Sequence, residues 1–324
     1  MINNYSWVEK YRPSKLDEIS SQNHIINILK STLITKNLPH LILFGPSGCG
    51  KTSTVLALAK ELFGEEHYLD RIIELNASDE RGINIIREKI KNYAKLSIKN
   101  INNTPPWKII ILDEADTMTS DSQFALRRII EQYSKITRFC IICNYHTKII
   151  EPIISRCSLL RFKPIEEKFI LERLKYICEK ENMNYNKKLL NKIIKLCRGD
   201  LRKAINLLQK CNNSYNTNTN NINEEILNEI SGIIPDNIFE KLMQYIFDKD
   251  YKNIDLIINQ IYNDGYSLVN QILLFHNYIL NSNLSNNNKT DILQKIIEVD
   301  HNLINCSDEY IQLYNLVYYI IIKS

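Results

Sequence analysis

The residues best suited to chemistry form one short stretch that fits the phosphate-binding loop pattern G-x-x-x-x-G-K-[ST] at every fixed position. Its members are, in order, Gly45, Pro46, Ser47, Gly48, Cys49, Gly50, Lys51 and Thr52. Three of the chain's eight glycines fall here, where a backbone without side chains can curl so that its N–H groups face phosphate oxygens. Lys51 would neutralise the β- and γ-phosphates of a nucleotide, and Thr52 would give its hydroxyl to Mg²⁺.

The elements that flank this loop match the setting that a phosphate loop requires. The apolar run 41–44 predicts a short buried strand, and residues 53–62 predict a helix whose N-terminus faces the bound anion. The alternative is a chance glycine-rich turn, which would not need a strand before it and a helix after it. The sequence therefore predicts nucleotide binding.

Polar residues at the ends of two further apolar runs could complete the site. The run 107–112 leads directly into Asp113 and Glu114. Asp113 would supply the carboxylate on the Mg²⁺ side, and Glu114 would polarise the attacking water. Asn144 closes a strand predicted from residue 138, where a polar side chain can orient water or the γ-phosphate. The alternative is that these strands simply end in polar turns.

The whole chain is predicted to be an α/β phosphate-loop ATPase core with a parallel sheet, followed by a small helical lid and an all-α domain. Seven of the eight prolines precede residue 165, so breakers are concentrated in the first part. We expect the core at 1–163, the lid at 164–223 ending in an Asn-rich linker from Asn212, and about five helices in 224–324.

Within the core, further elements follow from hydrophobic patterning. The predicted elements are a helix pair in 17–37, a buried strand at 71–76, a helix from Ile83, an amphipathic helix at 120–133 and a strand through Phe162. Trp7 belongs to an aromatic and charged N-terminal segment that either packs on the core or contacts a base.

Composition excludes several classes of protein. A net charge of +4 is too small to argue for nucleic acid by itself, although the excess of basic residues lies in the first half. Eight cysteines without regular spacing favour an intracellular, reducing compartment. Cys140 and Cys143 form a C-x-x-C on a predicted strand, where they would point to opposite faces and fill the core rather than bind zinc. No apolar run reaches the length of a membrane span, so we expect no membrane partner.

Beyond the phosphate loop, the chain resembles the AAA+ sliding-clamp loaders, specifically the small subunits of eukaryotic-type replication factor C. The matching segments occur in the family's order and are Val8-Glu-Lys-Tyr-Arg-Pro13, Asn76-Ala-Ser-Asp-Glu-Arg-Gly82, Asp113-Glu-Ala-Asp116, Ala125-Leu-Arg-Arg128, Ile142-Cys-Asn-Tyr145, Ser155-Arg-Cys157 and Gly199-Asp-Leu-Arg202. The helical remainder resembles the family's collar, the oligomerisation domain, through weaker motifs.

The resemblance implies roles for individual residues of the nucleotide site. Val8 and Arg12 would border the adenine, and Asn144 would sense the γ-phosphate. Arg202 would reach the same phosphate from the lid. Arg156 would act as an arginine finger in the neighbouring subunit's site, whereas the alternative is an internal ion pair near Arg161.

The resemblance also implies the larger function, which is ATP-dependent loading of a ring-shaped clamp onto primer–template DNA as one small subunit of a heteropentamer. Arg81 and Arg87 would contact DNA phosphates; the alternative is that both arginines only solvate a helix face. The helix from Ile83 to about Lys95 would dock on the clamp. The protein would then be nuclear in a eukaryote. The alternatives are a phosphate-loop helicase or another AAA+ DNA-remodelling ATPase, and a structural subunit that binds ATP without hydrolysing it.

Overall fold

A computed structural model of the chain describes residues 6–19, 21–77, 83–96, 104–213 and 224–323. The chain divides into two compact units, Met1–Gln209 and Lys210–Ser324. The predicted three-part division at 163 and 223 stays a prediction, since the lid helices cluster with the core in the first unit.

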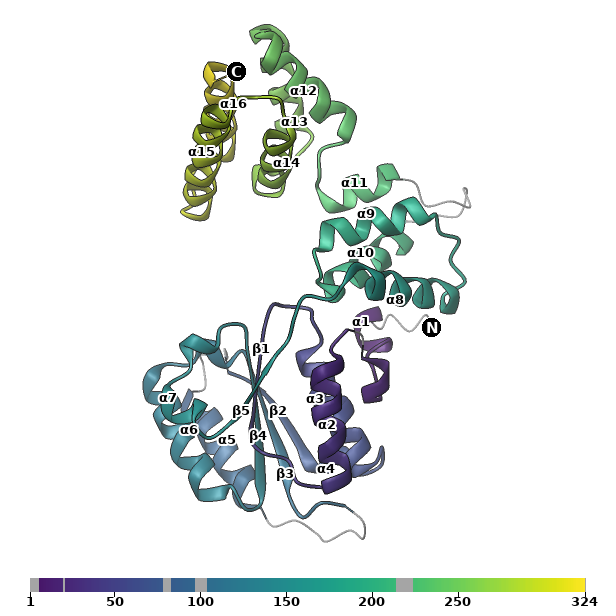
Figure 1. The fold of residues 1–324 in the computed structure, drawn as a ribbon, viewed down its shortest axis with the longest axis vertical. Helices are drawn as coiled ribbons and strands as arrows, with labels where there is room; N and C mark the ends of the chain where they lie inside the picture. Colours follow the sequence, from purple (N-terminus) through teal and green to yellow (C-terminus); the bar gives the residue numbers. More distant parts are fainter. Residues whose placement is uncertain (1–5, 20, 78–82, 97–103, 214–223, 324) are drawn as a thin grey trace. The chain divides into compact units, whose positions relative to one another are not determined.

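The first unit is built on one parallel sheet, as the sequence predicts (Figure 1). Its strands lie in the order β2-β3-β4-β1-β5. Their bounds are β1 Leu41–Phe44, β2 Ile72–Asn76, β3 Lys108–Asp113, β4 Thr137–Cys143 and β5 Ser158–Arg161. Because β1 pairs with both β4 and β5, the strand before the phosphate loop lies inside the sheet.

Helices cover both faces of this sheet (Figure 1). They are α2 Asn23–Thr35, α3 Lys51–Phe63, α4 Tyr68–Arg71, α5 Ile83–Lys95, α6 Ser120–Tyr133 and α7 Glu151–Ile154. On one face, Ile90 of α5 and Ile130 of α6 pack on Ile110, Phe139 and neighbouring strand residues. Helix α3, which begins at the phosphate-loop lysine, contacts β3 and β4 from the other face.

Two details of the core and one of the lid differ from the sequence prediction. The expected helix pair in 17–37 is a single helix, α2, preceded by a short 3₁₀ turn at Leu16–Glu18, because Ser21 takes a left-handed conformation with φ of 63°. Strand β2 is only partly buried, since it lies at the edge of the sheet. The predicted linker starts too early, because α10 extends through Asn213.

The remaining helices of the first unit are an N-terminal turn and the predicted lid. They are α1 Trp7–Lys10, α8 Glu167–Lys180, α9 Lys187–Cys197 and α10 Leu201–Asn213, the last of which runs into the second unit. Trp7 is buried, and its backbone N–H donates to Gln209 Oε1 at 2.9 Å. The packing alternative for Trp7 is therefore the one that the structure shows.

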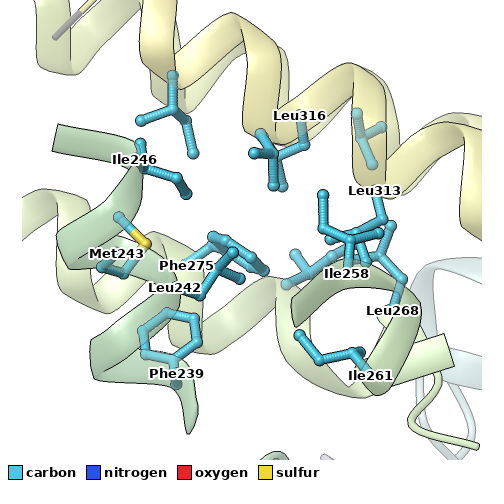
Figure 2. Packing of buried hydrophobic residues seen from close by; sticks show 14 of the residues in the cluster. Phe239, Leu242, Met243, Ile246, Ile258, Ile261, Leu268, Phe275, Leu313 and Leu316 are labelled. Carbon is cyan, nitrogen blue, oxygen red and sulfur yellow. The ribbon is translucent and has the colours of Figure 1, made fainter. Parts of the chain in front are cut away.

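The second unit is entirely helical in its described residues. Its helices are α11 Glu224–Ser231, α12 Asp236–Asp248, α13 Tyr251–Asn263, α14 Leu268–Asn281, α15 Asn286–Ile304 and α16 Glu309–Lys323. Helices α12–α16 share one apolar core, and α11 is an additional short helix before it. Figure 2 shows how the aromatic ring of Phe275 meets Phe239, with ring centroids 5.1 Å apart in an edge-to-face arrangement.

Phe275 provides a test of this helical core. It is completely buried, so Phe275→Ala should leave a cavity and lower the free energy of unfolding by about 3–5 kcal/mol. The control Ile297→Ala, at a position 69% exposed, should change it by about 0.5 kcal/mol or less. Urea unfolding followed by circular dichroism measures both, and equal losses in the two variants would contradict the packing described here.

Candidate nucleotide-binding and hydrolysis site

The predicted site residues meet at the carboxyl edge of the sheet. Phe44 of β1 lies beside Cys143 of β4, so the loop from Gly45 and the side chain of Asn144 leave the sheet at the same level. Strand β3 pairs with the other side of β4 and ends in Asp113. The carboxyl edge of an open parallel sheet is where ligands bind in α/β proteins.

Lys51 lies against its own loop. Its ammonium donates to Gly45 O at 2.7 Å, to Pro46 O at 2.8 Å and to Asn144 Oδ1 at 3.1 Å. The side chain is only 8% exposed, so three acceptors compensate the loss of water around its charge. The predicted lysine and the predicted asparagine are thus in direct contact, at the position where a phosphate would be bound.

The hydroxyl of Thr52 donates to Asp113 Oδ2 at 2.8 Å. A hydroxyl and a carboxylate are the hard oxygen ligands that Mg²⁺ prefers, and this cation commonly uses one or two carboxylates together with phosphate oxygens. The pair therefore fits Mg²⁺ in the way predicted. In the described part of the chain, no group of three or more His, Cys, Asp or Glu side chains could hold a metal by themselves, so a cation here would also need oxygen ligands from the nucleotide.

Glu114 follows Asp113 in a left-handed conformation with φ of 54°. Its backbone N–H donates to Asp113 Oδ1 at 2.9 Å, and its side chain is exposed at the pocket. Non-glycine residues in this conformation are strained and are concentrated at functional sites. The geometry gives the two adjacent acids different surroundings, since Asp113 faces Thr52 and Glu114 faces solvent.

Glycine is required by the loop's backbone. Gly48 and Gly50 have φ of 65° and 93°, in the region that side chains disfavour. A Cβ on Gly45, whose φ is 149°, would lie 2.3 Å from the backbone oxygen of Phe162. The loop therefore needs glycine both for its left-handed turn and for its close approach to Phe162, the residue after β5.

The cysteines of this region are neutral packing residues. The thiol of Cys49 donates to Pro46 O at 2.9 Å, and burial raises its pKa. Burial also raises the pKa of Cys143 to about 12. Cys140 and Cys143 are both buried as free thiols, which confirms that this C-x-x-C fills the core.

A pocket at this edge collects most of the predicted residues with several that sequence reasoning missed. The predicted residues among its lining are Val8, Arg12, Ser47, Gly48, Cys49, Gly50, Lys51, Thr52, Asp113, Glu114, Asn144 and Arg202. The missed ones include Tyr11, Ile19, Ile165, Leu201 and Ile205. The lining thus combines apolar side chains with the phosphate loop, a combination that suits a ligand with a base and phosphates.

Arg12 lies among carboxylates at this pocket. Its guanidinium pairs with Glu9 at 2.6 Å, while its Nε is buried without a hydrogen-bond partner. Glu74 of β2 is a neighbouring group that the sequence did not reveal. Burial raises the pKa of Glu74, Asp113 and Glu9 raise it further, and Arg12 opposes them.

Arg156 lies outside this pocket. It follows α7 and pairs with Glu131 of α6 at 2.8 Å, while also donating to Pro152 O at 2.7 Å. Glu131 is shared with Arg127, at 3.0 Å. An ion pair therefore exists, as the alternative prediction had it, but with Glu131. Its role toward a neighbouring subunit stays a prediction.

The side chains of the two arginines predicted to contact DNA lie outside the described part of the structure. Arg81 lies outside the described residues, and Arg87 belongs to α5 by its backbone, with its side chain outside the description. Their predicted contact with DNA phosphates stays a prediction.

Three family models match successive parts of the chain. Residues 41–165 match the model described as "ATPase family associated with various cellular activities (AAA)". Residues 172–211 match the "RCF1/5-like, AAA+ ATPase lid domain", and residues 234–319 match the "Replication factor C C-terminal domain". The fold and the site thus define an AAA+ ATPase with a lid and a helical C-terminal domain, which confirms the predicted fold class.

Relatives extend this class to a family. The chain is 44% identical over 321 residues to replication factor C subunit 2 of Saccharomyces cerevisiae, covering 96% of this chain and 91% of that protein. It is 43% identical over 318 residues to replication factor C subunit 4 of Homo sapiens, covering 96% and 86%. The chain belongs to the replication factor C small subunits, which are clamp-loader subunits in DNA replication, and it is an ATPase.

A solved structure of the Thermotoga maritima RuvB Holliday junction branch migration motor shares the fold. Its TM-score is 0.54 at 19% identity, covering 72% of this chain and 79% of that one. In the described residues of this chain, all strands belong to a single sheet in the first unit, so the second motor domain expected of the helicase alternative is not found there. None of the described helices has the length and apolar character needed to cross a membrane.

Gly45 offers a test of the loop's geometry. Gly45→Ala should cost about 2–4 kcal/mol of stability, because the new Cβ would meet a backbone oxygen that cannot swing aside. Gly265→Ala is the matched control, since φ there is also positive, 78°, but the space is open. It should cost about 1 kcal/mol. Urea unfolding compares the two, and a Gly45→Ala variant as stable as the control would contradict the close approach to Phe162.

Proposed function

We propose that this chain works as one small subunit of a hetero-oligomeric clamp loader, a pentamer, that opens and places a ring-shaped clamp on primer–template DNA at the expense of ATP. The observation that carries the proposal is the convergence of Lys51, Thr52, Asp113 and Asn144 at one sheet edge, in a chain that carries the lid and C-terminal domains of the family. In a eukaryotic source the protein would act in the nucleus.

The residues of the pocket divide the work. Lys51 exchanges its contacts with loop carbonyls for phosphate oxygens, and the backbone N–H groups of the glycine loop hold the same phosphates. Thr52 and Asp113 would hold Mg²⁺, which when bound neutralises charge that develops on the phosphates. Glu114 orients and polarises the attacking water, and Asn144 fixes the γ-phosphate end.

The remaining roles concern groups beyond this pocket. Val8 and Arg12 border the base, and Arg202 reaches the γ-phosphate from the lid. Arg81 and Arg87 contact DNA phosphates, and α5 contacts the clamp. These assignments are supported by family membership and, for the three pocket residues, by their place in the lining.

Arg156 is proposed to serve the neighbouring subunit. Arg156 is absent from the lining of its own pocket, and its side chain, just after the short helix α7, is about 38% exposed. An exposed ion pair such as Arg156–Glu131 contributes little to stability, so assembly can redirect the arginine. Hydrolysis would then depend on the assembled complex. Lys51, Asp113 and Glu114 are all present in the pocket, which argues against a purely structural subunit.

Lys51 tests nucleotide binding. Lys51→Ala should weaken ATP binding at this site by at least about tenfold, because it removes charge-assisted hydrogen bonds to phosphate. Calorimetric titration of the full chain with ATP measures the loss, and circular dichroism checks the fold. Lys60→Ala, a lysine of the same helix outside the pocket, should bind normally. Unchanged affinity in Lys51→Ala would refute the assignment.

Arg156 tests the division of labour between subunits. In a reconstituted complex, Arg156→Ala should slow hydrolysis at the adjacent subunit's site by about 10³-fold or more while its own site keeps its ATP affinity. Complexes with a single active phosphate loop, placed first in the neighbour and then in the mutant subunit, separate the two sites. Arg161→Ala, an exposed arginine of β5, is the matched control. Loss of turnover confined to the mutant's own site would rule out action across the interface.

A further inference from the structure

The lid contacts the phosphate loop through Asp200, the residue that precedes α10. Ser47 Oγ of the loop donates to Asp200 Oδ2 at 3.0 Å. Beside it, the backbone N–H of Leu201 donates to Gly48 O at 3.2 Å. Two hydrogen bonds therefore join the start of a lid helix to the middle of a loop some 150 residues earlier in the chain.

The same carboxylate also holds the helix. Asp200 Oδ1 accepts from the backbone N–H of Lys203 at 2.9 Å, the usual bond of an N-cap aspartate. Its backbone oxygen accepts from Ala204 at 3.1 Å. One oxygen of Asp200 thus fixes the first turn of α10, and the other fixes that turn to Ser47.

The residue before Asp200 is fixed from the other side. Gly199 has φ of 87°, and a Cβ there would lie 2.7 Å from Cβ of Pro164. Its carbonyl accepts from the N–H of Ile165 at 3.2 Å. The start of α10 is therefore held between the segment that leads into the lid and the phosphate loop.

This attachment determines where the first turn of α10 faces. Leu201, Arg202 and Ile205 all line the nucleotide pocket, and Arg202 is only two residues after Asp200. We propose that Asp200 is a positioning residue that locks the first turn of α10 onto Ser47 and Gly48 and thereby aims Arg202 at the terminal phosphate. The proposal rests on the role assigned above to Arg202.

The loop is shaped to admit this carboxylate. A Cβ on Gly48 would lie 1.8 Å from Asp200 Oδ1, so any larger residue at 48 would displace the aspartate. Gly48 thus serves two purposes, since its left-handed backbone forms the loop and its missing side chain makes room for the lid. An ordinary helix cap would need neither Ser47 nor Gly48.

The test compares affinities for ATP and ADP in the full chain by calorimetry. Only ATP carries the phosphate that Arg202 would reach, so Asp200→Ala should lower the preference for ATP over ADP by about three- to tenfold, with ADP affinity changed by less than about twofold. Asp200→Asn should restore most of the preference, because its amide oxygen can accept from the N–H of Lys203 while its amide N–H₂ donates to Ser47 Oγ.

Asn186→Ala is the matched control. Asn186 caps the neighbouring lid helix α9 by accepting from Lys188 N–H at 3.0 Å and does not line the pocket. Its loss should lower thermal stability as a cap deletion does, with the ATP preference unchanged. If Asp200→Ala changes stability alone, as Asn186→Ala does, the residue is only a cap and the proposal is wrong.

A double-mutant cycle isolates the contact itself. Ser47→Ala and Asp200→Ala should each lower the ATP preference, and the double variant should lower it no more than Asp200→Ala alone. Additive losses would overturn the proposed coupling. If the unmutated chain binds neither ATP nor ADP, both the proposed function and this inference are wrong. If the unmutated chain prefers ATP and the Asp200→Ala variant prefers it equally, only this inference is wrong.

Discussion

The order of the parallel strands is the constraint on which the rest of the structure depends. Strand β1 lies beside β4, and β3 lies on the far side of β4, so the segments after all three strands leave one edge together. The hydrogen bond from Thr52 to Asp113 depends on this order, because the two residues are 61 positions apart in the chain and meet only where these strands end. An order that placed β3 far from β1 would separate the phosphate loop from Asp113 and Glu114.

The same edge has to accommodate a buried cation. Lys51 is largely removed from water, and a lone buried ammonium would be costly. Two loop carbonyls and the amide of Asn144 use the three donors that an ammonium offers. A phosphate group brings negative charge to these donors, so binding replaces neutral acceptors by charged ones, which form stronger bonds. The three donors of the Lys51 ammonium thus both hold the loop in place and favour a bound anion.

The sequence predicts the polar edge of the sheet better than it predicts the pocket's walls. The positions of Lys51, Thr52, Asp113 and Asn144 follow from a motif and from the ends of apolar runs, which are local signals. The apolar lining carries no such signal, since Ile165 and Ile205 resemble any core residue until the lid is packed on the core. Glu131 could not be predicted as the partner of Arg156 either, because surface ion pairs leave no periodic pattern.

The placement of Arg156 supports the proposal that a neighbouring subunit completes the catalytic site. Arg156 and Arg127 share the carboxylate of Glu131 on the outer surface, and an exposed shared carboxylate holds neither arginine strongly. The lining of the pocket includes the cation of Lys51 and the arginines Arg12, Arg173 and Arg202, the last two of them on the lid. A transition state that spreads charge over the γ-phosphate benefits from a further cation. Arg156 does not line its own pocket. If a neighbour presents the same arginine to this pocket, as proposed, hydrolysis depends on the neighbour being in place.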